Sequence, residues 1–214
     1  MAKDNPALRS EVLRSPLVTA TARGVGGIAG PLATGRSRIV QPPRGIGAEE
    51  FIEDGRLLLI ATTVQAAKRH RTDRGETNIY TFVLYGDVRS AANVERLLGV
   101  NEAWARKVGG APIFIFGDLN VEEHESEILK EWGRTEYMTD IFKLHAHARG
   151  REPEPTSAAG RRIDFAFANY SARKLVKRSG MKDLFSTHKT LEVESNVEPM
   201  GQLGAAVTSG HVFT

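Results

Sequence analysis

A carboxylate and an amide lie two residues apart at the end of an apolar run, in Phe116-Gly117-Asp118-Leu119-Asn120. If the strand continues, its period of two places the side chains of Asp118 and Asn120 on the same side of the sheet edge. Asp118 could then bind a hard cation or take a proton from water, while Asn120 orients a group by hydrogen bonds without adding charge. Gly, Asp and Asn are also common turn residues, so a simple turn is the alternative interpretation.

Two later segments supply a second carboxylate and a histidine. In Arg161-Arg162-Ile163-Asp164-Phe165-Ala166-Phe167, Asp164 interrupts an otherwise apolar strand, where an ionised carboxylate requires a partner. In Phe185-Ser186-Thr187-His188-Lys189, His188 lies in a polar loop before the last apolar strand. Asp164 could meet His188 across neighbouring strands, fix the tautomer of its imidazole and raise its basicity. The alternative is that His188 is a solvent-exposed loop histidine.

The elements that must position these residues alternate between strands and helices. Apolar and β-branched runs predict strands, which fall at residues 57–64, 78–85, 113–116, 163–167 and 191–193. The basic stretch between the first two strands would be a hairpin loop. Spaced apolar residues predict helices over 91–108, ended by Gly109-Gly110, and over 123–132. Adjacent strands suggest antiparallel pairing, and the predicted class is α/β or α+β with more than one sheet layer.

The composition of the 214-residue chain excludes several classes of protein. Because it has no cysteine, disulfide scaffolds, zinc ribbons, iron–sulfur sites and cysteine nucleophiles are excluded. The longest apolar run, residues 57–61, is far shorter than the roughly 20 residues of a membrane span, and residues 1–15 lack the apolar core of a signal peptide. We therefore expect an intracellular protein, in the cytoplasm or the nucleus, without a membrane or disulfide partner; its oligomeric state is open.

The net charge of +3 hides a segregation of charge along the chain. Basic residues outnumber acidic ones by seven to two over residues 1–46 and by eight to two over residues 161–189, whereas residues 118–136 carry seven acidic and two basic residues. Basic surfaces around an acidic zone would suit a metal-dependent enzyme acting on a polyanion, with binding that weakens steeply with salt. Ordinary solvated surface is the alternative interpretation.

In this order and spacing, the three motifs resemble the endonuclease/exonuclease/phosphatase superfamily, which includes DNase I-like nucleases, apurinic/apyrimidinic and retroelement endonucleases, and inositol polyphosphate phosphatases. Further segments fit the resemblance, namely Gly26-Gly27-Ile28-Ala29, Val83-Leu84-Tyr85-Gly86 and Pro155-Thr156. The resemblance covers residues 24–194 and implies a DNase I-like two-sheet sandwich flanked by helices. We expect an irregular segment over 1–23 before this domain and a tail over 195–214 after it.

The resemblance also implies a role for each residue of the three motifs. Asp118 would align or deprotonate the attacking water and bind the metal, and Asn120 would hold the phosphate or the nucleophile. Asp164 would orient His188, which would stabilise charge on the transition state. Mg²⁺ or Mn²⁺ would neutralise the leaving oxygen.

Three residues outside these motif positions complete the predicted site. The resemblance implies that Tyr85 contacts the phosphate. The basic pair Arg161 and Arg162, next to Asp164 in the sequence, is expected to bind substrate. Nucleic acid is the expected partner, because the basic surplus is spread over several segments.

Two features depart from the family's pattern. Members usually begin with a strand bearing Asn and then a Gln-Glu pair whose Glu binds the metal; no segment here matches, so we expect the first strand and helix of the fold to be missing. The usual Ser-Asp-His motif is Ser186-Thr187-His188, so Thr187 replaces an Asp that helps to bind the metal. Loss of two acids should weaken a Mg²⁺ site severely, because Mg²⁺ requires carboxylates in octahedral geometry. The chain could be a fragment, a variant with other ligands, or an inactive descendant.

Three functions are therefore weighed against one another. The leading hypothesis is a truncated or impaired endonuclease that hydrolyses phosphodiesters of nucleic acid with Mg²⁺. The second is a catalytically inactive domain of the same fold that binds nucleic acid or a protein, motivated by Thr187 and the absent glutamate. The third is a hydrolase similar to the inositol polyphosphate phosphatases.

Overall fold

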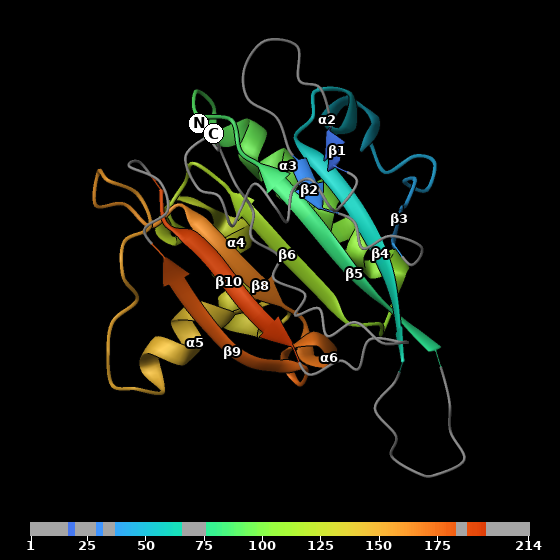
Figure 1. Cartoon of the computed structure of the whole chain (residues 1–214). Helices are drawn as coiled ribbons and strands as arrows, with labels where there is room; N and C mark the ends of the chain where they lie inside the picture. The colour runs from blue at the N-terminus through green and yellow to red at the C-terminus, as the bar shows by residue number, and fades with distance from the viewer. Residues whose placement is uncertain (1–16, 20–28, 32–36, 66–75, 183–187, 196–214) are drawn as a thin grey trace.

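A six-stranded mixed sheet and a two-stranded sheet form the centre of the protein (Figure 1). This computed structural model describes residues 17–19, 29–31, 37–65, 76–182 and 188–195. The strands are β1 (Leu17–Thr19), β2 (Ala29–Pro31), β3 (Ser37–Ile39), β4 (Leu57–Gln65), β5 (Glu76–Tyr85), β6 (Ile113–Asp118), β7 (Thr139–Asp140), β8 (Asp164–Ala168), β9 (Val176–Lys182) and β10 (Thr190–Ser195). The helices are α2 (Glu49–Glu53), α3 (Ala91–Val108), the 3-10 helix η2 (Glu123–Glu125), α4 (Glu127–Thr135), α5 (Ile141–His147) and α6 (Tyr170–Arg173).

The large sheet has the order β3-β4-β5-β6-β8-β7. β4 and β5 pair antiparallel along their whole lengths, which confirms the predicted hairpin pairing. β5 and β6 run parallel, contrary to the expectation that adjacent strands pair antiparallel. The reason is α3: a helix of this length carries the chain back to the same end of the sheet before β6 begins.

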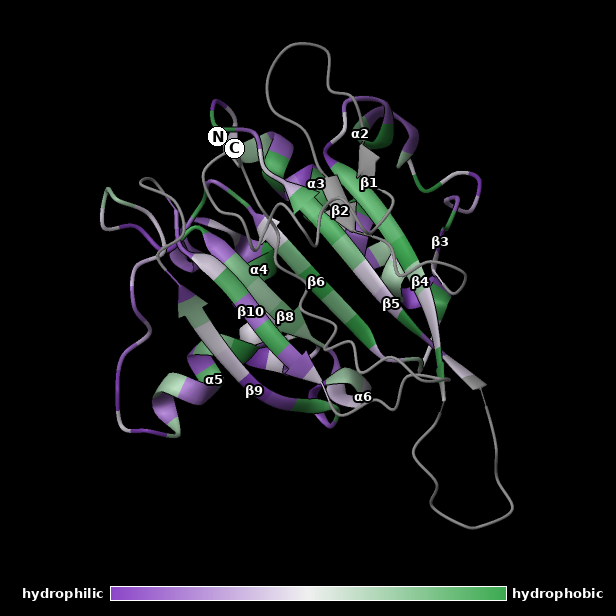
Figure 2. Ribbon diagram, in the orientation of Figure 1, coloured by the Kyte–Doolittle hydropathy of each residue, from purple (hydrophilic) through white to green (hydrophobic). Residues whose placement is uncertain are grey.

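The side chains of β6, near the middle of the large sheet, alternate between two cores that lie on opposite faces of the sheet. Ile113 and Ile115 of β6 face a core that includes Trp104 of α3 and Trp132 of α4. Phe114 and Phe116 face the opposite side, where β9, β10 and α5 pack over the sheet, as Figure 1 shows. The central strands are hydrophobic along most of their length (Figure 2). This arrangement of two sheets and flanking helices confirms the predicted α/β class.

Most predicted elements are present with small changes in their bounds. The helix predicted over 91–108 has those bounds, and the strand predicted over 163–167 runs from Asp164 to Ala168. The single helix predicted over 123–132 is wrong: η2 and α4 are separated at Ser126, which has extended φ and ψ of −119° and 127°. The Ser126 hydroxyl accepts a hydrogen bond from the backbone N–H of Leu129, so this residue begins a new helix.

Some sequence-based expectations fall outside the described residues. They concern the Gly26-Gly27-Ile28 segment, Ser186, Thr187 and the tail expected over 195–214, of which only Ser195 is described, as the last residue of β10. β1 lies within the segment 1–23 that was expected to be irregular, and pairs antiparallel with β2. The proposed domain bounds stay predictions. Within the described ranges, none of the helices has the length and apolar character needed to cross a bilayer.

Candidate active site

Three of the predicted site residues form one row across the large sheet. Asp118 is paired with Tyr85 of β5 on one side and with Asp164 of β8 on the other. Residues directly opposite one another on neighbouring strands have side chains on the same face. That face also carries Phe114 and Phe116, so the row lies at the end of the layer between the two sheets. Asp118 and Asp164 are only 4% and 2% exposed.

Strand β6 lies very close to its neighbour β5 at Gly117. A Cβ atom on Gly117 would lie 2.9 Å from the carbonyl oxygen of Leu84, so only glycine fits there comfortably. Leu119 then enters the core, and its N–H donates to the carbonyl of Ile163. These contacts bring the loops after β5 and β6 and the start of β8 together.

Asn120 reaches the site by a route that differs from the sequence-based expectation. β6 ends at Asp118, and Asn120 has a left-handed φ of 57°, so a continuing pleat does not place it beside Asp118. Its backbone N–H donates to Asp118 Oδ1 at 3.2 Å, and its side-chain Nδ2 donates to the carbonyl of Gly86 at 3.2 Å. Asparagine tolerates this backbone conformation better than most residues. Asn120 therefore ties the two loops together.

His188 is positioned by the loop that contains Thr156. The N–H of Lys189 donates to the carbonyl of Thr156, and His188 forms an isolated bridge with Ser157. The buried hydroxyl of Thr156 accepts the N–H groups of Ile163 and Asp164. One residue thus places both partners of the Asp164–His188 pair. The Pro155-Thr156 match pointed to this residue, but nothing in the sequence indicated its dual role.

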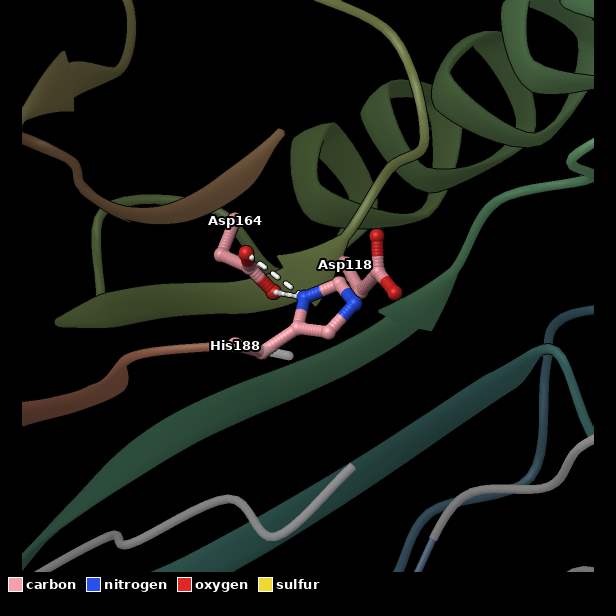
Figure 3. A group of neighbouring side chains, drawn as sticks. All are labelled: Asp118, Asp164 and His188. Atoms are coloured by element: carbon pink, nitrogen blue, oxygen red, sulfur yellow. Dashed lines mark hydrogen bonds and ion pairs between the residues drawn. The ribbon is translucent and has the colours of Figure 1, made fainter. Parts of the chain in front are cut away.

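Asp164, His188 and Asp118 lie next to one another, as predicted (Figure 3). Nδ1 of His188 is 3.2 and 3.0 Å from the two carboxylate oxygens of Asp164. An ionised carboxylate only accepts hydrogen bonds, so Nδ1 carries a hydrogen when Asp164 is ionised. The other ring nitrogen, Nε2, points towards Asp118 (Figure 3). A group bound between His188 and Asp118 would meet a basic nitrogen on one side and a carboxylate on the other.

Burial makes both carboxyl groups weaker acids than usual. The pKa of Asp118 is raised to about 6, first by desolvation and then by the negative charge of Asp164, while His188 partly offsets the shift. The pKa of Asp164 is also raised by desolvation, which hydrogen bonds to the side chains of His188 and Thr156 oppose. The pKa of Tyr85 is raised by its partial burial and by the charge of Asp118. Asp118 therefore changes charge close to neutral pH, as a general base requires.

The donor set fits a divalent cation in its charge and spacing. Ligand atoms of Asp118, Asp164 and His188 all lie within 4.8 Å of one another. Desolvation and, after it, repulsion from Asp164 raise the pKa of Asp118, and a bound cation would offset both by favouring the ionised carboxylate. Since Asp164 is bonded to His188, Asp118 is the carboxylate of this group best placed to bind an ion.

The two predicted substrate-binding arginines both have acidic partners. Arg161 forms ion pairs with Glu122 and Glu125 at the surface. Arg162 pairs with Asp140, its side chain is 13% exposed, and its guanidinium lies over the ring of Phe165. A direct contact between Arg162 and a substrate would require this buried ion pair to open, which favours a structural role for Arg162.

Comparisons with known proteins identify the fold. No protein-family model matches the sequence, and no curated protein matches it. The endonuclease domain of TRAS1, a telomere-specific non-LTR retrotransposon, superimposes with a TM-score of 0.55 at 12% identity, over 82% of this chain and 76% of that one. TDP2 of D. rerio, complexed with a single-strand DNA product, gives a TM-score of 0.50 at 11% identity, over 86% and 77% of the two chains. The chain thus shares the DNase I-like fold of these two structures.

Proposed function

We propose that this chain is a divalent-metal-dependent phosphodiesterase that acts on nucleic acid, most simply as an endonuclease. The observation that carries the proposal is the meeting of two buried carboxylates and one imidazole at the edge of the sheet. The endonuclease domain of TRAS1 and TDP2 with its DNA product share the fold, which supports nucleic acid as the substrate.

In the proposed reaction, water attacks phosphorus and the bond from phosphorus to the leaving oxygen breaks. Asp118 accepts the proton of the attacking water, because burial and the neighbouring Asp164 make it more basic than an exposed carboxylate. Asp164 accepts the Nδ1 hydrogen of His188 and favours the protonated imidazole, whose Nε2–H faces the phosphoryl oxygens and donates a hydrogen bond to the charge that develops there. A bound Mg²⁺ or Mn²⁺ would supply neutralisation of the leaving oxygen, with Asp118 as a ligand.

Three further residues have supporting roles in this proposal. Asn120 orients the nucleophile or the phosphate from its fixed position beside Asp118. Tyr85, opposite Asp118 in the sheet, contacts the phosphate. Arg161 is partly exposed at the rim and binds the substrate backbone only when its ion pairs with Glu122 and Glu125 open; Arg162 contributes by holding the same loop through Asp140.

A plasmid-nicking assay tests the proposal. We expect the parent chain to nick supercoiled DNA with Mg²⁺ or Mn²⁺ and to stop when EDTA is added. Loss of a general base or of the transition-state stabiliser should each cost about 10²-fold or more, so Asp118→Asn and His188→Ala should both be nearly inactive. The control is His145→Ala, since His145 contacts Ser179 and takes no part in the site. An inactive parent at every metal concentration, or an active Asp118→Asn variant, would contradict the proposal.

A non-catalytic binding domain is the second candidate, and the substitution Thr187 favours it. The same assay on Thr187→Asp separates the two candidates. If the parent is inactive and Thr187→Asp nicks DNA, the missing ligand is the only defect of an otherwise assembled site. If both are inactive while DNA is retained on a filter, the binding domain is supported.

A further inference from the structure

Arg56 occupies a position next to the site that no sequence motif indicated. It directly precedes β4, and its backbone carbonyl accepts the N–H of Tyr85. Its side chain then crosses to the end of β5, where Nη1 donates to the carbonyl oxygens of Tyr85 at 3.4 Å and of Gly86 at 3.1 Å. The guanidinium also lies 5.6 Å from the centre of the Tyr85 ring. Arg56 thus contacts both the backbone and the ring of Tyr85.

Gly86 is the junction through which Arg56 reaches the rest of the site. The carbonyl oxygen of Gly86 accepts from Asn120 Nδ2 as well as from Arg56. The N–H of Gly86 donates to the carbonyl of Asp118 at 2.7 Å. A Cβ atom on Gly86 would lie only 1.9 Å from the carbonyl oxygen of Leu119, so the two loops are in direct backbone contact. A shift of the Gly86 carbonyl would therefore move the acceptor that holds Asn120.

We propose that Arg56 is a positioning residue, which fixes Tyr85 and the Gly86 carbonyl and through that carbonyl holds Asn120 beside Asp118. A charged donor gives stronger hydrogen bonds than a neutral one, and one cationic nitrogen here serves two carbonyls. The stacked guanidinium restricts the Tyr85 ring in the same contact. Arg56 does not contact the substrate in this proposal, so it affects catalysis only through the positions of Tyr85, Gly86 and Asn120.

Arg96 is a control for Arg56, because it makes similar stabilising contacts away from the site. Arg96 on α3 also stacks on an aromatic ring, that of Phe51 at 5.4 Å, and makes one surface ion pair with Glu50. It has the same side chain and the same kind of ring contact, but none of its partners among the described residues belongs to the site. Arg56→Met and Arg96→Met therefore remove similar stabilising contacts and differ in the connection to Asn120.

The first experiment measures position without relying on activity. NMR spectra of ¹⁵N- and ¹³C-labelled protein report the side-chain amide of Asn120 and the ring of Tyr85. We expect both sets of signals to shift in Arg56→Met and to stay in place in Arg96→Met. Arg56→Lys, which keeps the charge, should restore the parent signals in part and serves if the Met variant does not fold. Unshifted Asn120 and Tyr85 signals in folded Arg56→Met or Arg56→Lys would overturn the inference.

The second experiment rests on the proposed function and uses kinetics. Misplaced catalytic groups lower the rate of the chemical step, so kcat of Arg56→Met should fall about tenfold while KM stays within about twofold. Since Arg56 acts partly through the acceptor of Asn120, the loss should shrink to about threefold in an Asn120→Gly background, and the remaining loss should come from Tyr85. Additive losses would overturn the coupling. An inactive parent would refute the proposed function, whereas the NMR result would still decide the role of Arg56.

Discussion

The ionised form of Asp118 that the proposed reaction requires is also the form that destabilises the fold. Asp118 is almost completely buried and faces a second carboxylate, and both factors favour its neutral form. A carboxyl group whose pKa is higher in the folded than in the unfolded chain loses stabilising free energy as pH rises through the folded pKa. The penalty is absent well below the unfolded value of 3.8 and complete above about 6. Chemistry near neutral pH would therefore be possible only at the expense of fold stability.

Asp118→Asn should stabilise the protein at neutral pH while removing the proposed base. A shift of about two pKa units corresponds to about 3 kcal/mol, so the free energy of unfolding at pH 7.5 should rise by up to that amount. Near pH 4 the gain should fall below about 1 kcal/mol, because the native carboxyl is then already protonated. Urea denaturation at the two pH values measures both, with the exposed Asp54→Asn as the control. A gain that does not depend on pH would contradict the assigned cause.

The loops after β5 and β6 are in contact because the two parallel strands approach each other closely. Gly86→Ala should destabilise the protein by about 3 kcal/mol, the upper part of the range for overpacked sites, because the new Cβ would meet backbone atoms that cannot rotate away. Urea denaturation checks this value. Gly180→Ala in β9 is the control, since an added Cβ there meets nothing within 4 Å. Equal stability of the two variants would show that the loops can separate at little cost.

The length and burial of each helix and strand explain which of them the sequence could predict. Periodicity located β4, β5, β6 and α3 well, because each is long enough for burial to impose its pattern. It missed the break at Ser126, since a capping serine within a charged stretch does not interrupt the apolar spacing. The parallel pairing of β5 and β6 was missed because the direction of pairing follows from the path of α3, which spacing does not encode.

The candidate site was predictable to a similar degree. The meeting of Asp118, Asp164 and His188 followed from the resemblance, and the structure brings the three together. Asn120 was correctly placed near Asp118, but the pleat argument failed at its left-handed backbone. Thr156 lies in a matched motif, but its contacts with Asp164 and Lys189 could not be foreseen; Arg56 contacts backbone groups far away in the sequence, so no local motif could reveal it. Such contacts become visible only when the strands are assembled.

At the scale of the whole molecule, folding redistributes the charge that the sequence segregates. Most basic residues of the segment 161–189 pair with acids from other segments: Lys177 and Arg178 share Glu194, Lys182 pairs with Glu192, and Lys189 pairs with Glu154. Arg161, Arg162 and Arg173 likewise have acidic partners. The positive charge that remains free on this surface is therefore small. We expect binding to nucleic acid to weaken less steeply with salt than the sequence alone suggests. Lys174 differs, since its ammonium group contacts the ring of Tyr170 and forms no ion pair with an acidic residue in the described part of the chain.

Lys174→Gln and Lys177→Gln should consequently have different effects on nucleic-acid binding. A cation that contacts a phosphate contributes about 0.9 to the slope of log K against log salt for duplex DNA. Lys177 keeps Glu194 beside it at 2.7 Å, and that carboxylate repels a phosphate even if the ion pair opens. We expect Lys177→Gln to change the slope by less than about 0.3 and Lys174→Gln to reduce it by about 0.9, as measured by filter binding between 50 and 200 mM salt. Equal and large changes in the slope for both variants would mean that the ion pairs of β9 open when DNA binds. The number of basic residues in the sequence would then predict the affinity better than the ion pairs of the folded chain.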